Sequence, residues 1–194
     1  MLRTFKETSE IIESGKACHI SGTESLLRKL PKGNWVGGST EYFMAEGGGI
    51  VTDQLLYVTL LPYDNINIKQ YDKSAVKNVA KDAYENGFTI LIIPFDSAVH
   101  IEYAENAAAY DDMFMKNIVG WISGMNLGKS DQAPISANGK TGEVYKDIAV
   151  AMHVEAPGDK TVSLNMINIF EQDADSPTIT FSDEGFSVEK CFID

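Results

Sequence analysis

Phe88-Thr89-Ile90-Leu91-Ile92-Ile93-Pro94-Phe95 is the stretch that decides the fold. It is apolar at nearly every position, whereas a strand with one face in water alternates apolar and polar residues. Such a run is typical of a central strand whose sheet is covered on both faces. The sequence therefore predicts a sheet layered with helices.

Helices and a further strand are predicted around this central strand. Residues 73–86 carry apolar side chains at helical spacing and predict one helix. Residues 97–104 predict another, with Asp96 or Ser97 as its N-cap. Residues 117–125, which contain Ile-Val-Gly-Trp-Ile-Ser-Gly-Met, predict the next strand.

The same order of elements occurs earlier in the chain, as an internal repeat. Each copy reads strand, helix, strand and then hairpin strands, and the middle strands align Trp35–Ser39 with Val119–Ser123. The first copy comprises residues 16–21, 23–30, 34–39 and the hairpin strands to 61; the second comprises 88–95, 97–104, 117–125 and the hairpin strands to 156. The predicted fold class is α/β (mixed α+β), with pseudo-duplicated units that form a mixed sheet layered with helices.

The predicted organisation is one globular domain over residues 1–194, with two repeated halves at 1–72 and 73–194 and no linker. The last part of the chain adds a predicted strand at 163–170, where apolar and polar residues alternate. A final hairpin is predicted from strands at 178–181 and 186–193.

Composition limits the classes of partner. The chain has 16 basic and 28 acidic residues, a net charge of −12, which argues against broad binding to nucleic acid or to an anionic membrane. No apolar run approaches the roughly 20 residues of a membrane span, and the charged start has no secretory core. We therefore expect a cytoplasmic protein. Cys18 and Cys191 match no zinc or redox spacing, and a long-range disulfide between them stays open.

Two stretches of this chain resemble the FIST sensory domain over about residues 15–156. Val36-Gly37-Gly38-Ser39-Thr40-Glu41 looks like its Gly-x-Ser-Thr element, and residues 118–124 with the Asn138-Gly139 turn look like its Val-Gly-Gly strand and hairpin. Trp121 departs from the small residue of that pattern. The resemblance implies a small-ligand-binding sensory or signalling module that is not catalytic, with a signalling partner or a homo-oligomeric state. Neither the resemblance nor the residues identify a cofactor, which stays unknown.

The expected ligand site lies where the repeated strands end, because α/β proteins place ligands at the carboxyl ends of strands. The candidate ligand-binding residues are Gly37, Gly38, Ser39, Thr40, Asp96, His100, Gly120, Trp121 and Ser123. No catalytic or metal-binding residue is assigned.

Two other functions stay open. Asp96 and His100, with Glu102 nearby, would serve a metal-dependent or hydrolytic enzyme. A serine hydrolase is disfavoured, because Glu41 stands where the Gly-x-Ser-x-Gly motif requires glycine after Ser39-Thr40. The third function is a structural or protein-interaction module that assembles through edge strands.

Overall fold

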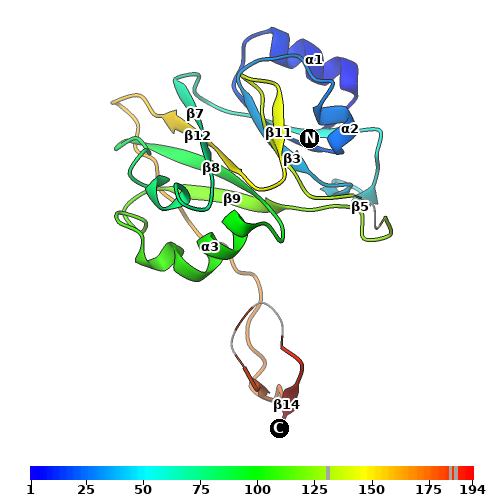
Figure 1. The fold of residues 1–194 in the computed structure, drawn as a ribbon, viewed down its shortest axis with the longest axis vertical. Helices are drawn as coiled ribbons and strands as arrows, with labels where there is room; N and C mark the ends of the chain where they lie inside the picture. Colours follow the sequence, from blue (N-terminus) through cyan, green and yellow to red (C-terminus); the bar gives the residue numbers. More distant parts are fainter. Residues whose placement is uncertain (130–131, 184, 186–187) are drawn as a thin grey trace. The chain divides into compact units, whose positions relative to one another are not determined.

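The computed structural model describes residues 1–129, 132–183, 185 and 188–194. It consists of two compact units, Met1–Ser163 and Leu164–Asp194, which are described separately (Figure 1). The boundary falls inside the single domain expected for residues 1–194. Its physical basis is that residues 164–183 bury none of their side chains, so they add nothing to a core.

The first unit contains two mixed sheets. The larger sheet has the order β1-β6-β2-β3-β10-β11 and the smaller has β7-β12-β8-β9. Their strands are β1 (Leu2–Arg3), β2 (Cys18–Gly22), β3 (Trp35–Ser39), β6 (Leu56–Leu60), β7 (Ile66–Tyr71), β8 (Gly87–Pro94), β9 (Ile118–Ser123), β10 (Ser136–Asn138), β11 (Glu143–Tyr145) and β12 (Ala149–Glu155). A separate hairpin joins β4 (Tyr42–Ala45) to β5 (Gly48–Val51).

Helices cover the outer face of each sheet, as Figure 1 shows for α1 and α2 on one side and α3 on the other. They are α1 (Phe5–Glu13), α2 (Glu24–Leu27) and α3 (Ala98–Asn106), with short 3₁₀ turns η1 (Val76–Asn78) and η2 (Ala107–Ala109). Threonine or serine caps each α-helix, at Thr4, Thr23 and Ser97. No helix in the described ranges is long and apolar enough to cross a membrane.

Strand β8 is central, as its sequence predicts. Leu91 and Ile93 pack into the cluster beneath η1 and α3, whereas Ile90 and Ile92 pack into the cluster between the two sheets. Successive side chains of a strand point to opposite faces, so one apolar run supplies both clusters. The result is a layered α/β/β/α unit, which confirms the mixed α+β class.

The helix predicted for residues 73–86 is wrong. Only Val76–Asn78 is helical there, as a 3₁₀ turn. The Asp72 carboxylate accepts hydrogen bonds from the backbone N–H of Ser74 and of Ala75, which closes a tight turn at the start. Farther along, the Asp82 carboxylate accepts from the Tyr71 hydroxyl and pairs with Lys69. These tertiary contacts outweigh the helical spacing.

The two sheets support the expected repeat. Both halves run strand, helix or 3₁₀ turn, strand, helix, strand, hairpin and strand, and they give the matching orders β1-β6-β2-β3 and β7-β12-β8-β9. Strand β7 therefore belongs to the second half, and the halves divide before residue 66 rather than after 72.

The alignment of the middle strands is shifted by one residue from the sequence-based one. Gly37 lies opposite Ile20 and Gly120 opposite Leu91, and in both places a side chain on glycine would meet that neighbour's carbonyl oxygen. Val36-Gly37 therefore matches Val119-Gly120. Gly38 then matches Trp121.

A buried polar chain crosses the smaller sheet. His153 is fully buried, with Nδ1 2.8 Å from the Thr89 hydroxyl and Nε2 2.9 Å from the Tyr71 hydroxyl. Because Tyr71 donates its own proton to Asp82, its oxygen accepts from His153 Nε2–H, and Nδ1 accepts from Thr89. Burial lowers the pKa of His153 to about 4, so the ring is neutral.

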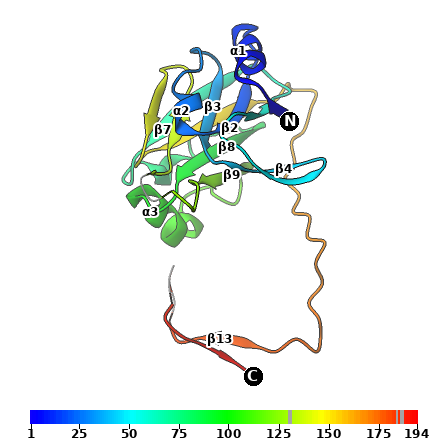
Figure 2. The same ribbon diagram turned by 90° about the vertical axis from the view of Figure 1, so that its right-hand side faces the viewer.

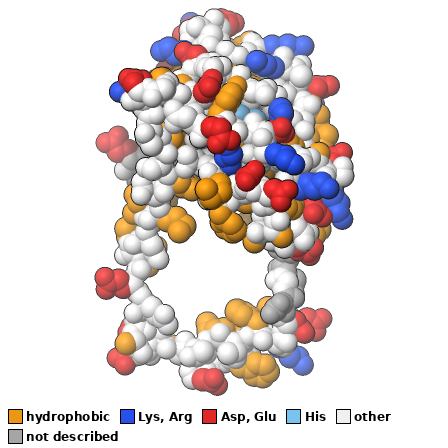
Figure 3. All heavy atoms as spheres, turned by 90° about the vertical axis from the view of Figure 1, so that its left-hand side faces the viewer, with side chains coloured by type: hydrophobic (Ala, Val, Ile, Leu, Met, Phe, Trp, Pro, Cys, Tyr) orange, Lys and Arg blue, Asp and Glu red, His pale blue; other side chains and the backbone are white. Residues whose placement is uncertain are grey.

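The second unit contains one hairpin, in which β13 (Ile179–Phe181) pairs with β14 (Cys191–Ile193). This confirms the predicted strand at 178–181 and the end of the one at 186–193, while Glu184, Phe186 and Ser187 lie outside the described residues. The strand predicted at 163–170 is not formed. Hydrophobic side chains are exposed in this unit (Figure 3). Cys191 is exposed, Cys18 is buried, and both are free thiols.

Candidate functional site

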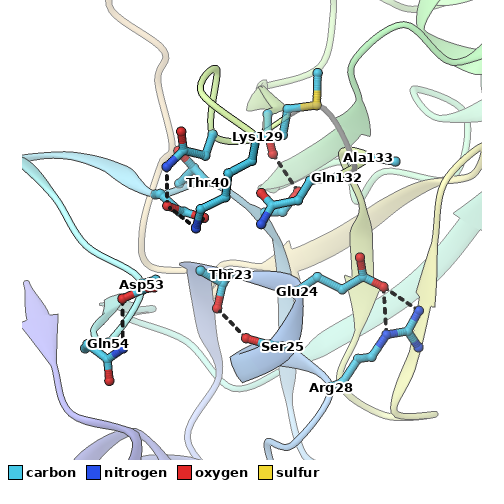
Figure 4. A pocket seen from close by; sticks show the side chains of 15 residues that line it. Thr23, Glu24, Ser25, Arg28, Thr40, Asp53, Gln54, Lys129, Gln132 and Ala133 are labelled. Atoms are coloured by element: carbon cyan, nitrogen blue, oxygen red, sulfur yellow. Dashed lines mark hydrogen bonds and ion pairs between the residues drawn. The ribbon is translucent and has the colours of Figure 1, made fainter.

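A cavity of about 460 Å³ opens where the parallel strands β2 and β3 end (Figure 4). Most of the residues that line it are polar or charged, and they come from four segments: the start of α2, the end of β3 with the residues after it, the turn before β6, and the segment that follows β9. The lining residues are Thr23, Glu24, Ser25, Arg28, Ser39, Thr40, Glu41, Asp53, Gln54, Gly124, Met125, Asn126, Lys129, Gln132 and Ala133.

Ser39 joins the segments that form the base of this cavity. Its hydroxyl donates to the Gly124 carbonyl over 2.7 Å and accepts from the Ile135 N–H over 2.8 Å. The Gly124 N–H also donates to the Ser39 carbonyl. The side chain is buried and both its donor and one acceptor position are occupied, so Ser39 positions the wall instead of offering a nucleophile.

Glu41 is the buried charge of the site. Its side chain is 5% exposed, and its carboxylate pairs with Lys129 Nζ at 2.9 and 3.2 Å. The Asn126 side-chain amide donates to the same carboxylate over 2.5 Å. Hydrogen bonds from Asn126 and Lys129 hold the pKa of Glu41 below its ordinary value, so the carboxylate is ionised at neutral pH.

Tyr42, the residue after Glu41, also hydrogen-bonds to the segment that follows β9. Its hydroxyl accepts from the Leu127 N–H over 3.0 Å and lies 3.4 Å from the Asn126 side-chain oxygen. That oxygen also accepts from the Gly128 N–H. Residues 126–129 are therefore held to the end of β3 by both neighbours, Glu41 and Tyr42.

The charges around the cavity are mostly paired within the protein. Arg28 pairs with Glu24 at 2.6 Å, and Lys129 pairs with Glu41, while Asp53 accepts from the Gln54 amide over 2.8 Å. Three acidic and two basic side chains line the wall, which leaves it slightly negative. The remaining lining is rich in hydroxyl and amide groups, which suit hydrogen bonding to a polar ligand.

The structure brings together only part of the predicted site. Ser39 and Thr40 line the cavity, as does Gly124, the residue after Ser123. Gly38 lies below, where the two sheets touch: a Cβ there would be 2.7 Å from Ile92 Cγ2 and 2.9 Å from Ser123 Cβ. Gly38 and Ser123 thus lie where the two sheets pack closely against each other, and they do not line the cavity.

Gly37, Gly120 and Trp121 also lie outside this cavity. The two glycines allow close pairing within their sheets. Trp121 packs between the sheets, and its indole N–H donates to His19 Nε2 over 2.7 Å. Trp121 fills the place in the second half that matches Gly38 in the first.

Asp96 and His100 do not line the cavity either. Ser97, not Asp96, caps α3, and Asp96 has a positive φ of 58°. Its N–H donates to His100 Nδ1 over 3.2 Å, and His100 is buried. Within the described ranges, no three or more His, Cys, Asp and Glu side chains are grouped so that they could hold a metal ion.

Sequence reasoning missed four important residues of the cavity: Thr23, Glu41, Asn126 and Lys129. Glu41 stands inside the quoted motif, and its position after Ser39-Thr40 was a usable signal. Asn126 and Lys129 are more than 80 residues away along the chain, and nothing in a single sequence pairs them with Glu41.

The fold and the cavity define a duplicated α/β/β/α protein with a polar site at its strand ends. Residues 3–194 match the model of a family of unknown function, DUF6976, and the chain belongs to that family. No curated protein matches it, and no solved structure does.

Proposed function

We propose that this chain is a cytoplasmic binding module for one small polar molecule, with a sensory or signalling role rather than a catalytic one. The observation that carries the proposal is the cavity of about 460 Å³ at the ends of β2 and β3. Its volume is within the range of small-molecule sites, and its position is the usual one for ligands in α/β proteins. The sensory role rests on the resemblance to the FIST domain.

The wall favours a neutral or weakly cationic ligand that is rich in hydroxyl or amide groups. Arg28 and Lys129 are already paired with Glu24 and Glu41, so an anion would have to compete with carboxylates that are in place. Asp53 adds a further negative charge at the wall. Sugars, polyols and small amides fit this chemistry, whereas phosphorylated metabolites do not.

The contacts of Glu41 also suggest how binding could be transmitted. They tie residues 126–129 to the end of β3, so a ligand that bonds to Glu41 or Asn126 would compete with or reinforce this link. Binding would then alter the order of a surface segment, which is one of the known forms of switching in proteins.

Native mass spectrometry of the full chain, purified from its own host, tests the proposal. We expect one small molecule per chain in the wild type. Ser25→Trp places an indole in the cavity wall and should remove it, because Ser25 is exposed and lines the cavity. Ser163→Trp is the matched control, since Ser163 is exposed and lies outside the cavity.

A parallel thermal-shift screen uses monosaccharides, polyols and small amides, with inorganic phosphate as the comparison. A bound molecule stabilises the folded state by mass action, so a hit should raise the melting temperature of wild type and S163W but not of S25W. A bare wild-type chain with no hit in either assay would overturn the proposal. So would a molecule that S25W retains.

A further inference from the structure

The hairpin of the second half completes the sheet of the first. Strand β10 pairs antiparallel with the edge of β3, with Ala137 opposite Gly37 and Asn138 opposite Val36. The pairing uses the backbone groups of β3 that point away from β2, as shown by the hydrogen bonds Gly139 N–H to Trp35 O and Ser39 N–H to Ile135 O. The edge of β3 is therefore covered.

The matching edge in the second half has no such partner in the part of the chain that the structure describes. Strand β9 ends the order β7-β12-β8-β9. The Thr89 N–H donates to the Asn117 carbonyl and the Phe95 N–H donates to the Ser123 carbonyl. The backbone groups of the odd-numbered residues along β9 therefore point toward β8. Backbone groups alternate along a strand, so those of Gly120 and Ile122 point to the open edge. Val119 and Ile122 are 38% and 39% exposed.

The hairpin of the first half that matches β10–β11 is β4–β5, and among the described strands it joins neither of the two large sheets. Strands β4 and β5 pair only with each other among the described strands, and Figure 2 shows β4 reaching out from the two sheets. Met44 is 77% and Val51 59% exposed. Phe43, on the other face, is buried and stacks with Tyr57, which keeps the hairpin in place.

The length of the connection explains why this hairpin does not reach β9 of its own chain. Twelve residues link β9 to β10, whereas only Thr40 and Glu41 link β3 to β4. Tyr42 is also bonded to residues 126 and 127, so the hairpin begins beside the segment after β9 and leads away from it. Two residues cannot carry β4 around to the open edge.

We propose that the open edge of β9 receives β4 of a second copy of this chain, in the antiparallel manner of β10 on β3. The exchange is reciprocal, because each copy offers one hairpin and one edge, and it gives a two-fold dimer with two equal interfaces. Pairing would cover exposed backbone groups that otherwise invite aggregation. The chain already makes this kind of pairing once, between β10 of its second half and β3 of its first half. By analogy, the partner of β9 is the matching strand β4, supplied by a second copy.

Light scattering coupled to gel filtration, over a range of protein concentrations, tests this proposal. We expect twice the chain mass for the wild type and a monomer for the double variant Met44→Lys, Val51→Lys. Lysine lowers the net negative charge, so added repulsion between copies would not explain a loss of the dimer. Met166→Lys, Ile167→Lys is the matched control, because these side chains are 97% and 88% exposed in the second unit.

Amide hydrogen exchange on the same proteins locates the interface. The N–H groups of Gly120 and Ile122 should be protected in the wild type and in the control, and should exchange faster in the hairpin variant. Circular dichroism checks that the variant keeps its fold. A monomeric wild type would overturn the proposal, as would a dimer that persists in the hairpin variant or unchanged exchange at Gly120 and Ile122.

Discussion

At the scale of single residues, His153 makes the protein sensitive to mild acid. Its pKa is about 6.5 in the unfolded chain and about 4 when buried, so the neutral ring stabilises the fold above pH 6.5 and this contribution is lost as the pH falls toward 4. We expect the free energy of unfolding to drop by about 2 kcal/mol between pH 7 and pH 5 from this group.

Urea unfolding at the two pH values measures this loss. In His153→Gln the amide cannot titrate, so the drop should shrink by about that amount, although the variant starts less stable. His19, whose pKa is also lowered to about 4 by burial, still contributes in the same pH window. An equal drop in wild type and H153Q would contradict the prediction.

Gly38 sets the distance between the two sheets. In Gly38→Ala the new methyl would lie 2.7 Å from Ile92 Cγ2 and 2.9 Å from Ser123 Cβ, so the sheets would have to shift. We expect a destabilisation of about 1–3 kcal/mol by chemical denaturation. Gly47→Ala is the control, because nothing lies within 4 Å of that position. Equal stabilities of the two variants would rule out a packing role for Gly38.

At the scale of elements, α3 begins with two caps from different parts of the chain. The Ser97 hydroxyl accepts from the His100 N–H, and Asp147, 49 residues from Ala98, accepts from the Ala98 N–H over 2.6 Å. Asp147→Ala should cost about 1 kcal/mol of stability in thermal or urea unfolding. Asp159→Ala, at an exposed surface pair with Lys160, should change little. An equal loss of stability in both variants would show that Asp147 does not stabilise the protein as a helix cap.

The elements also show what a sequence can predict. Strand β8, helix α3 and the hairpin at Asn138-Gly139 follow from local patterns, because apolar runs, caps and turn residues act over a few positions. The helix at 73–86 failed because Tyr71 and Lys69 draw Asp82 into tertiary contacts.

The site could be predicted less well than the fold. Ser39 and Thr40 lie on the cavity because strand ends are visible in the pattern. Asn126 and Lys129 could not be placed there, since their contact with Glu41 depends on how the segment after β9 returns to β3. Asp96 and His100 were predicted as ligand residues because they follow the end of β8. At that strand end Ser97 and Asp147 cap helix α3 instead.

At the scale of the whole molecule, the described core residues all belong to Met1–Ser163. A chain that ends at Ser163 should therefore fold with the melting temperature of the full chain, within about 2 °C for a loss below half a kcal/mol. Thermal unfolding followed by circular dichroism measures it. A clear fall in melting temperature would show that residues 164–194 stabilise the first unit.

The matching strand orders of the two halves bear on how the chain could have evolved. Two halves of like topology, one of which lends a hairpin to the other, are the arrangement that gene duplication and fusion of an exchanged dimer of half-length chains would leave. The peptide between β6 and β7 would then be a late addition that folding does not require. Fragments 1–63 and 64–194, expressed together, should reassemble into one particle, and each alone should aggregate or unfold, since neither sheet interior is closed without the other.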